Sequence, residues 1–282
     1  MILSDLRKAY HKKIFQEILY LKHGVPNFAD KDSKSSSEIA CEMIKSIGLK
    51  PRGKPVSEQS VGKVFGELTC DYLNKSFSKL AAFRPGEWNY STSQDAEGIT
   101  KFAQYRHLAI LDQELQKNRD LKSILGGTYL VRPDIIIARA PVSDKEINRK
   151  EDLLGEKEEI SRLTPFRARN STALILHACV SCKWTIRSDR SQNTRTEALN
   201  LIRFRKGNAP HIVAVIAEPL PTRIASIALG TGDIDCVYHV MLPELKAAAE
   251  NLKKEDQLDM LTTLISGERL RDISDLPFEL AV

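Results

Sequence analysis

An apolar run at residues 173–184 most constrains how this chain can fold. It reads ALILHACVSCKW and is nearly uninterrupted by polar residues. A continuous run of this length, rather than an alternating one, is typical of a strand that is covered on both faces. Similar runs at residues 129–138 (YLVRPDIIIA) and 211–217 (HIVAVIA) predict further strands. The chain therefore needs helices on both sides of a sheet.

Helical patterns surround these strands. Apolar residues recur every three or four positions in several segments, which places them on one face of a helix. We predict helices at residues 3–20, 39–47, 61–80, 100–118, 196–206, 242–252 and 257–265, and shorter strands at 88–90 and 236–240. Helices that flank a few central strands predict an α/β fold, and the absence of a clear linker predicts one domain over residues 1–282.

Composition narrows the class of protein. Hydrophobic residues make up 42% and charged residues 28%, as in ordinary globular proteins. No stretch approaches the roughly 18 consecutive apolar residues of a membrane span, and the early charges of MILSDLRKAYHKK are unlike a secretory signal. Five cysteines without a small-scaffold pattern suit a reducing compartment. We expect a cytoplasmic protein without membrane association, whose net charge of +5 permits a polyanionic partner without requiring one.

Two polar residues interrupt or end the predicted strands. Asp134 follows Pro133 inside one apolar run, and Lys183 stands near the end of another. An acid and a lysine at neighbouring strand ends can share a cleft, where the carboxylate holds a hard cation and the ammonium steadies charge on a phosphate. The alternatives are a structural acid beside a proline and a lysine that reaches solvent along its aliphatic stem.

Glu197 is a further candidate metal ligand, downstream of Lys183. Its spacing from Thr194 also fits a capping box, in which the glutamate binds the start of its own helix. The two roles are compatible, because an acid in the first turn of a helix can also face a nearby cation.

Two arginines bracket an acid in the sequence RSDR at residues 187–190. Arginine donates two hydrogen bonds to guanine O6 and N7, and aspartate can accept one from cytosine N4. Arg187, Asp189 and Arg190 therefore suit a loop that reads G·C base pairs. The alternative is a solvated loop with internal ion pairs, which is the common explanation of a charge run.

A zinc site has little support. Cys179-x-x-Cys182 and Cys236-x-x-His239 have the spacing of a four-ligand site. Both pairs lie in predicted strands, where residues three apart point to opposite faces. His177, inside an apolar run, is expected to be a hydrogen-bonded core residue.

The dipeptide PD at residues 133–134, the tripeptide SCK at 181–183 and Glu197 together resemble the PD-(D/E)xK nuclease core. The likeness is to the group of type II restriction endonucleases that read CCGG-centred sites. In the common pattern an acid stands two residues before the lysine, where this chain has Ser181. In this group that acid comes from the next helix, where Glu197 stands. Further runs such as SCKWTIRSDR and RLRDISDLPFELAV extend the likeness over essentially the whole chain.

The resemblance implies a restriction-endonuclease-like fold with a central mixed β-sheet flanked by helices. It implies that Asp134, the backbone carbonyl of Cys182 and Glu197 bind Mg²⁺, and that Lys183 assists the attacking water. A further family acid follows a phenylalanine on an earlier helix. Here Phe65 is followed by Gly66, and Glu67 comes one place later. Because one residue turns a helix by about 100°, either Glu67 reaches the site by local adjustment or this acid's role is weakened.

The same resemblance implies the roles of the DNA-contacting residues. Arg187, Asp189 and Arg190 would read the CCGG core, Gln59 would enter the minor groove, and Asp30 would contact the outer base pair. The residues expected to read the inner four bases match the family's residues better than those expected to read the outer pair.

The implied activity is Mg²⁺-dependent cleavage of double-stranded DNA at G/CCGGC, which leaves 5′-phosphates and CCGG 5′ overhangs. A homotetramer built as a dimer of dimers and a cognate DNA methyltransferase in the host are also implied. Two other functions stay open, a repair or recombination nuclease without strict sequence specificity and a DNA-binding module that does not cut. The long charged segment at residues 143–170 is a possible dimer–dimer contact.

Overall fold

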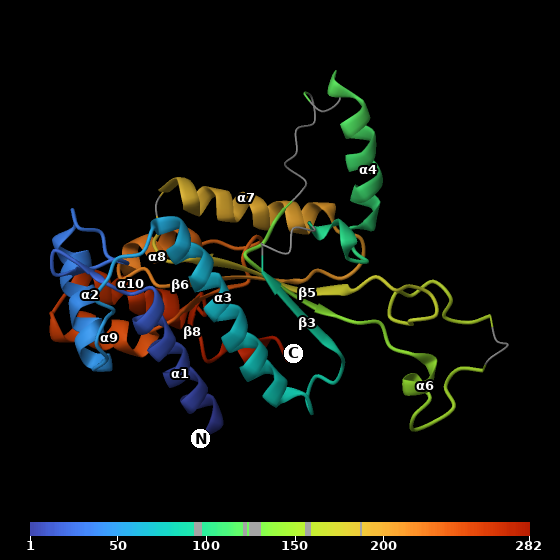
Figure 1. Cartoon of the computed structure of the whole chain (residues 1–282), viewed down its shortest axis with the longest axis horizontal. Helices are drawn as coiled ribbons and strands as arrows, with labels where there is room; N and C mark the ends of the chain where they lie inside the picture. The colour runs from blue at the N-terminus through green and yellow to red at the C-terminus, as the bar shows by residue number, and fades with distance from the viewer. Residues whose placement is uncertain (93–97, 121–122, 124–130, 156–158, 187) are drawn as a thin grey trace.

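A six-stranded mixed sheet forms the centre of the computed structural model (Figure 1). The structure describes residues 1–92, 98–120, 123, 131–155, 159–186 and 188–282. The strands, in spatial order, are β3 (Trp88–Thr92), β4 (Ile135–Arg139), β5 (Ile175–Lys183), β6 (His211–Ile216), β7 (Cys236–His239) and β8 (Leu270–Asp272). The pairs β3–β4 and β4–β5 are antiparallel, and the pairs from β5 to β8 are parallel. The predicted α/β class with a mixed sheet is confirmed.

Helices cover both faces of this sheet. In Figure 1, α7 (Ser188–Phe204) runs along one side and α3 (Glu58–Phe77) crosses the other. The remaining helices are α1 (Ile2–Glu17), α2 (Lys34–Ile47), α4 (Arg106–Lys117), α6 (Asp144–Ile147), α8 (Pro221–Ala228), α9 (Leu242–Asn251), α10 (Glu255–Ser266) and α11 (Leu276–Glu279). Short 3-10 turns lie at Ser78–Leu80 and Ile99–Lys101, and β1 (Leu21–Lys22) pairs with β2 (Val25–Pro26) in a separate hairpin.

The apolar run that predicted a doubly covered strand is the central strand β5. Leu176, Ala178 and Val180 are buried, and so is the interleaved Cys179, so that both faces are shielded from solvent. His177 is also buried, and its Nε2 lies 2.8 Å from the carbonyl oxygen of Leu280, as expected of a hydrogen-bonded core histidine. Buried hydrophobic side chains from α1 to the last turn of the chain form one connected cluster.

Two element boundaries differ from the sequence-based predictions in ways that affect function. The strand β4 begins at Ile135, after Pro133 and Asp134, because a proline cannot donate to a strand ladder; residues 129 and 130 lie outside the described ranges. The helix α7 begins at Ser188, well before the predicted start at residue 196. Thr194 and Glu197 are therefore interior helical residues, and the capping-box interpretation is wrong.

Other differences concern short or polar elements. The helix α2 begins at Lys34 rather than residue 39, because the Ser33 side chain caps it by accepting a hydrogen bond from the Ser36 amide. Only Arg106–Lys117 of the predicted helix at 100–118 is α-helical. The elements α8, β8 and α11 were not predicted. Among the described residues, no helix has both the length and the apolar character required to cross a bilayer.

The N-terminal helix is fixed to the far edge of the sheet by one arginine. Arg7 donates from Nη1 and Nη2 to Glu244 at 2.9 and 2.7 Å, and from Nε and Nη2 to Asp272 at 2.9 and 2.8 Å. Asp272 is only 8% exposed. The guanidinium thus joins α1 to the start of α9 and to β8, through paired hydrogen bonds in a site with little water.

Replacing Arg7 by alanine should destabilise the fold by about 3–5 kcal/mol, because two largely buried carboxylates lose their cation. Urea unfolding followed by circular dichroism measures this change. Lys13→Ala is the control, since Lys13 pairs with Asp71 at 2.8 Å on the surface, where such a pair contributes at most about 1 kcal/mol. Equal losses in the two variants would contradict the role given to Arg7.

Candidate active site

The ends of β4 and β5 meet at the carboxylate of Asp134. Its Oδ2 accepts a hydrogen bond from the backbone N–H of Cys182 at 2.7 Å and another from Lys183 Nζ at 3.1 Å. Asp134 directly precedes β4, and the antiparallel register sets Ile135 opposite Val180 on β5. The structure therefore brings together the acid and the lysine that the sequence placed at two strand ends.

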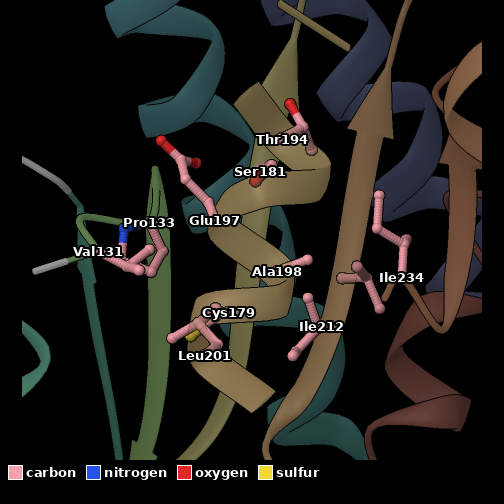
Figure 2. Close-up of a pocket in the computed structure, with 11 residues that line it drawn as sticks. Val131, Pro133, Cys179, Ser181, Thr194, Glu197, Ala198, Leu201, Ile212 and Ile234 are labelled. Carbon is pink, nitrogen blue, oxygen red and sulfur yellow. The ribbon is translucent and has the colours of Figure 1, made fainter. Parts of the chain in front are cut away.

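Glu197 approaches the same place from α7. It is partly buried and lines a small cavity with Pro133 and Ser181 (Figure 2). Burial raises the pKa of Glu197; the charge of Lys183 lowers it and that of Asp134 raises it. Since both charges act on this carboxyl group, Glu197, Lys183 and Asp134 belong to one electrostatic site.

Ser181 and Glu197 line the same cavity, which has a volume of about 10 Å³. Such a volume is close to the minimum that holds one water molecule. The serine stands where the common nuclease pattern has its second acid, and the helix acid reaches the adjoining space. The small side chain at residue 181 thus leaves room for a carboxylate that comes from α7.

The donor set fits a hard cation. Asp134, directly before β4, and Glu197 on α7 can supply carboxylate oxygens, and Cys182, the residue before the last one of β5, can supply a backbone carbonyl. Mg²⁺ needs only one or two protein carboxylates, because it retains waters and takes phosphate oxygens from the substrate. The negative charge of Asp134 raises the pKa of Glu197. A cation between the two carboxylates would offset this repulsion.

The zinc ligands proposed as an alternative have other partners or directions. Cys179 and Cys182 lie three residues apart on the continuous strand β5, so their side chains face opposite ways. His239 uses both ring nitrogens on backbone groups, with Nε2 3.1 Å from the Glu218 carbonyl and Nδ1 2.9 Å from the Met241 amide. Within the described part of the chain, no three His, Cys, Asp or Glu side chains form a metal-binding group.

The last three residues of the RSDR sequence begin a helix rather than the predicted loop. Arg187 lies outside the described residues, and Ser188 begins α7. Asp189 and Arg190 belong to its first turn, but their side chains also lie outside what the structure describes. Glu197 follows on the same helix, so α7 carries residues 188–190 of the RSDR sequence and the acid of the candidate site.

The other predicted DNA-contacting residues lie on separate elements. Gln59 is exposed in the first turn of α3, just after the N-cap Ser57. Asp30 forms an ion pair with Arg223, in the first turn of α8. Arg223 was missed at the sequence level because α8 was not predicted there.

Glu218 was also missed, although its position carried a signal. It follows the apolar run HIVAVIA, as Lys183 follows another. The residue is only 1% exposed, and its oxygens accept hydrogen bonds from the backbone amides of Ile186 at 3.0 Å and Leu220 at 3.2 Å. Burial raises the pKa of Glu218 to about 7, although both hydrogen bonds and the charge of Arg223 act to lower it.

Glu67 lies on the exposed side of α3. Its side chain is 44% exposed and lies 4.0 Å from Lys63, one turn earlier. The preceding Gly66 is buried, and a Cβ placed there would meet no atom within 4 Å. The position that carries an acid in the resembled family therefore has space for a side chain that this chain lacks.

Comparison with known proteins identifies the family of the chain. The family model of the NgoMIV restriction enzyme matches residues 10–282. The chain is 43% identical over 285 residues to the type II restriction enzyme NgoMIV of Neisseria gonorrhoeae, an alignment that covers 100% of this chain and 99% of that protein. Restriction endonucleases generally use a divalent metal, as the carboxylate pair suggests. The chain belongs to the NgoMIV restriction enzyme family, and it is a DNA-binding type II restriction endonuclease that hydrolyses DNA.

Proposed function

We propose that this enzyme cuts double-stranded DNA at the palindrome GCCGGC in a Mg²⁺-dependent reaction, as G/CCGGC. The observation that carries the proposal is the meeting of Asp134, Lys183 and Glu197 at the ends of β4 and β5 and on α7. Hydrolysis after the first base leaves 5′-phosphates and CCGG overhangs. Residues 1–282 act as a single restriction endonuclease domain, in keeping with the connected core.

The proposed metal ligands are Asp134, Glu197 and the carbonyl oxygen of Cys182. When bound, Mg²⁺ supplies Lewis acidity that stabilises charge on the phosphoryl oxygens. The hydrogen bonds from Cys182 and Lys183 both use Oδ2 of Asp134, so Oδ1 is the oxygen better placed to bind a cation. These bonds also fix the orientation of the carboxylate before metal and substrate arrive, which favours catalysis.

Lys183 has a separate part in the proposed reaction. Its side chain is only 20% exposed, and its Nζ lies 3.1 Å from Asp134 Oδ2. A restrained positive charge at this point stabilises the negative charge that develops on the phosphate and orients the attacking water. The side chain requires no rearrangement for this, since its partner already lies at the strand end.

Sequence reading divides into inner and outer contacts. Arg187, Asp189 and Arg190 are proposed to read the CCGG core. The ion pair of Asp30 and Arg223 suits the outer G·C pair, because arginine donates to guanine and aspartate accepts from cytosine N4. Asp30 and Arg223 already lie together without DNA. When DNA binds, each can replace its bond to the other by a hydrogen bond to one base of the outer pair.

Gln59 is proposed to contact the minor groove. It is exposed at the start of α3, and an amide side chain can both donate and accept hydrogen bonds. The minor groove distinguishes mainly A·T from G·C pairs, so this contact supports rather than sets the specificity.

A palindromic target implies a two-fold dimer, and we propose that two dimers associate through the segment 143–170. This segment extends beyond the sheet in Figure 1. It exposes Leu153, Ile160, Leu163 and Phe166, with Leu163 97% exposed. Clustered exposed apolar side chains of this kind mark association surfaces. A cytoplasmic location and a cognate DNA methyltransferase in the host complete the proposal.

Digestion of phage DNA of known sequence with Mg²⁺, followed by end mapping, tests the function. Discrete fragments ending in 5′-CCGG are expected. A smear would indicate a nuclease without strict specificity, and binding without cutting would indicate a DNA-binding module.

Lys183→Ala should bind the same duplex but cut it about 10²–10⁴-fold more slowly, as measured by anisotropy and single-turnover cleavage. Lys246→Ala, on the exposed side of α9, is the matched control, and cutting by Lys183→Ala at the control rate would refute the mechanism.

Arg190→Ala and Arg223→Ala should relax different positions of the target. Each loss should lower discrimination by about 1–3 kcal/mol, at the CCGG core for Arg190 and at the outer base pair for Arg223. The measurement is kcat/KM on duplexes with one base pair changed at a time. Uniform weakening on every duplex would instead mark the arginine as a phosphate contact.

Leu163→Asp should convert the proposed tetramer into dimers, because a charge at an apolar interface is unfavourable. Light scattering coupled to size-exclusion chromatography gives the mass. Phe83→Asp is the control, since Phe83 is 77% exposed outside the segment and its replacement should leave the mass unchanged. An unchanged tetramer mass for Leu163→Asp would rule out this contact.

A further inference from the structure

Glu218 is a buried carboxylate that the proposed hydrolysis does not use. It lies two residues beyond β6 and is 1% exposed. Its Oε2 accepts the Ile186 amide at 3.0 Å, and its Oε1 accepts the Leu220 amide at 3.2 Å. Both oxygens are therefore engaged with backbone donors. Since burying a carboxylate is unfavourable, a residue that only closed a loop would not need this charge.

The two amides stand at the starts of two helices. Ile186 lies two residues before Ser188, the first residue of α7, and Leu220 is the N-cap of α8. The first turn of α7 carries Asp189 and Arg190, and the first turn of α8 carries Arg223. One carboxylate thus joins the chain segments from which the inner and outer base-reading residues arise.

Glu218 is itself held from the neighbouring strand β7. Its carbonyl oxygen lies 3.1 Å from Nε2 of His239, whose Nδ1 accepts from the Met241 amide at 2.9 Å. Since Nδ1 accepts, Nε2 carries the proton and donates to Glu218. Burial lowers the pKa of His239 to about 4, so the ring stays neutral and keeps this arrangement near neutral pH. The backbone of Glu218 is therefore fixed before its side chain fixes α7 and α8.

The ion pair of the outer base reader lies close enough to act on this group. Arg223 and Asp30 both influence the Glu218 carboxyl electrostatically, with opposite signs. The helices α7 and α8 also pack against each other. A change at Glu218 is therefore transmitted to both helix starts rather than to one loop.

We propose that Glu218 is a positioning residue for sequence discrimination, which sets the placement of the α7 start relative to the Asp30–Arg223 pair. The inference rests on the proposed function, because it takes these residues as the base readers. Asp134 and Lys183 bind each other at the ends of β4 and β5, and Glu197 lies about two and a half turns beyond the first residue of α7. Glu197 is therefore further along the chain from the Glu218 bonds than the proposed base readers of α7 are. Loss of the Glu218 bonds should therefore impair the choice of sequence more than the cutting.

The decisive variant is Glu218→Gln, which keeps the size of the side chain. One oxygen becomes an NH₂ group that cannot accept, so either the Ile186 or the Leu220 amide loses its partner. We expect the ratio of kcat/KM between the mapped wild-type site and single-base-pair variants to fall at least tenfold, at an inner and at an outer position. Cleavage of the mapped site itself should fall by a smaller factor.

Asp235→Asn is the matched control. Its carboxylate accepts the Ile212 amide at 2.7 Å, near the opposite end of β6, and its replacement should leave the ratio unchanged. Thermal melting of each variant checks folding. If Glu218→Gln gives no cooperative melt, Glu218→Asp serves instead, because it keeps the charge but is too short by one methylene to reach both amides.

An unchanged ratio in a folded Glu218 variant would overturn the proposal, and so would an equal fall in the Asp235→Asn control. Failure of the wild-type enzyme to cut at discrete sites would instead overturn the proposed function. The two failures are distinguishable, because the first leaves a specific wild-type enzyme and the second does not.

Discussion

The arrangement of the candidate site depends on the hydrogen bonds that the Asp134 carboxylate accepts. Pro133 prevents the strand from starting earlier, so Asp134 directly precedes β4 and is not one of its paired residues. There it accepts from the Cys182 amide and from Lys183. The backbone bond fixes the acid, and the acid in turn fixes the lysine. A strand end thus becomes a preorganised charged site without any loop to hold it.

The second acid of the candidate site comes from a helix whose first turn also carries two of the proposed base-reading residues. Because α7 begins at Ser188, its first turn contains Asp189 and Arg190, and Glu197 lies about two and a half turns further on. A rigid helix transmits a displacement of its start to its later turns. The proposed base contacts and the placement of Glu197 beside Asp134 therefore depend on the same helix, and the anchoring of Ile186 by Glu218 acts more on the base contacts, which lie nearer to it along the chain, than on Glu197.

The sequence predicted what depends on local pattern. The continuous run that became β5 and the helical spacing of α9 were sufficient to give the α/β class. The start of α7 was missed because RSDRSQNTRTE has no apolar periodicity before Ala198, so that propensity and packing decide it. Resemblance, rather than pattern, singled out Glu197. Glu218 was missed because its partner Ile186 is 32 residues away in the chain, and such a contact exists only in the folded state.

The helix α3 carries a departure from the pattern of the resembled family, and its consequence is electrostatic. There is space beside Gly66 for a side chain that glycine lacks. The next residue, Glu67, points about 100° further around the helix and pairs with Lys63 on the exposed side. The charged groups at the site are Asp134, Glu197 and Lys183. Burial raises the pKa of Glu197 most, and the charge of Asp134 adds to this rise while that of Lys183 opposes it. Without an acid from α3, the proposed metal ligands of the protein are Asp134, Glu197 and the Cys182 carbonyl, and phosphate oxygens of the DNA and waters would complete the coordination of Mg²⁺.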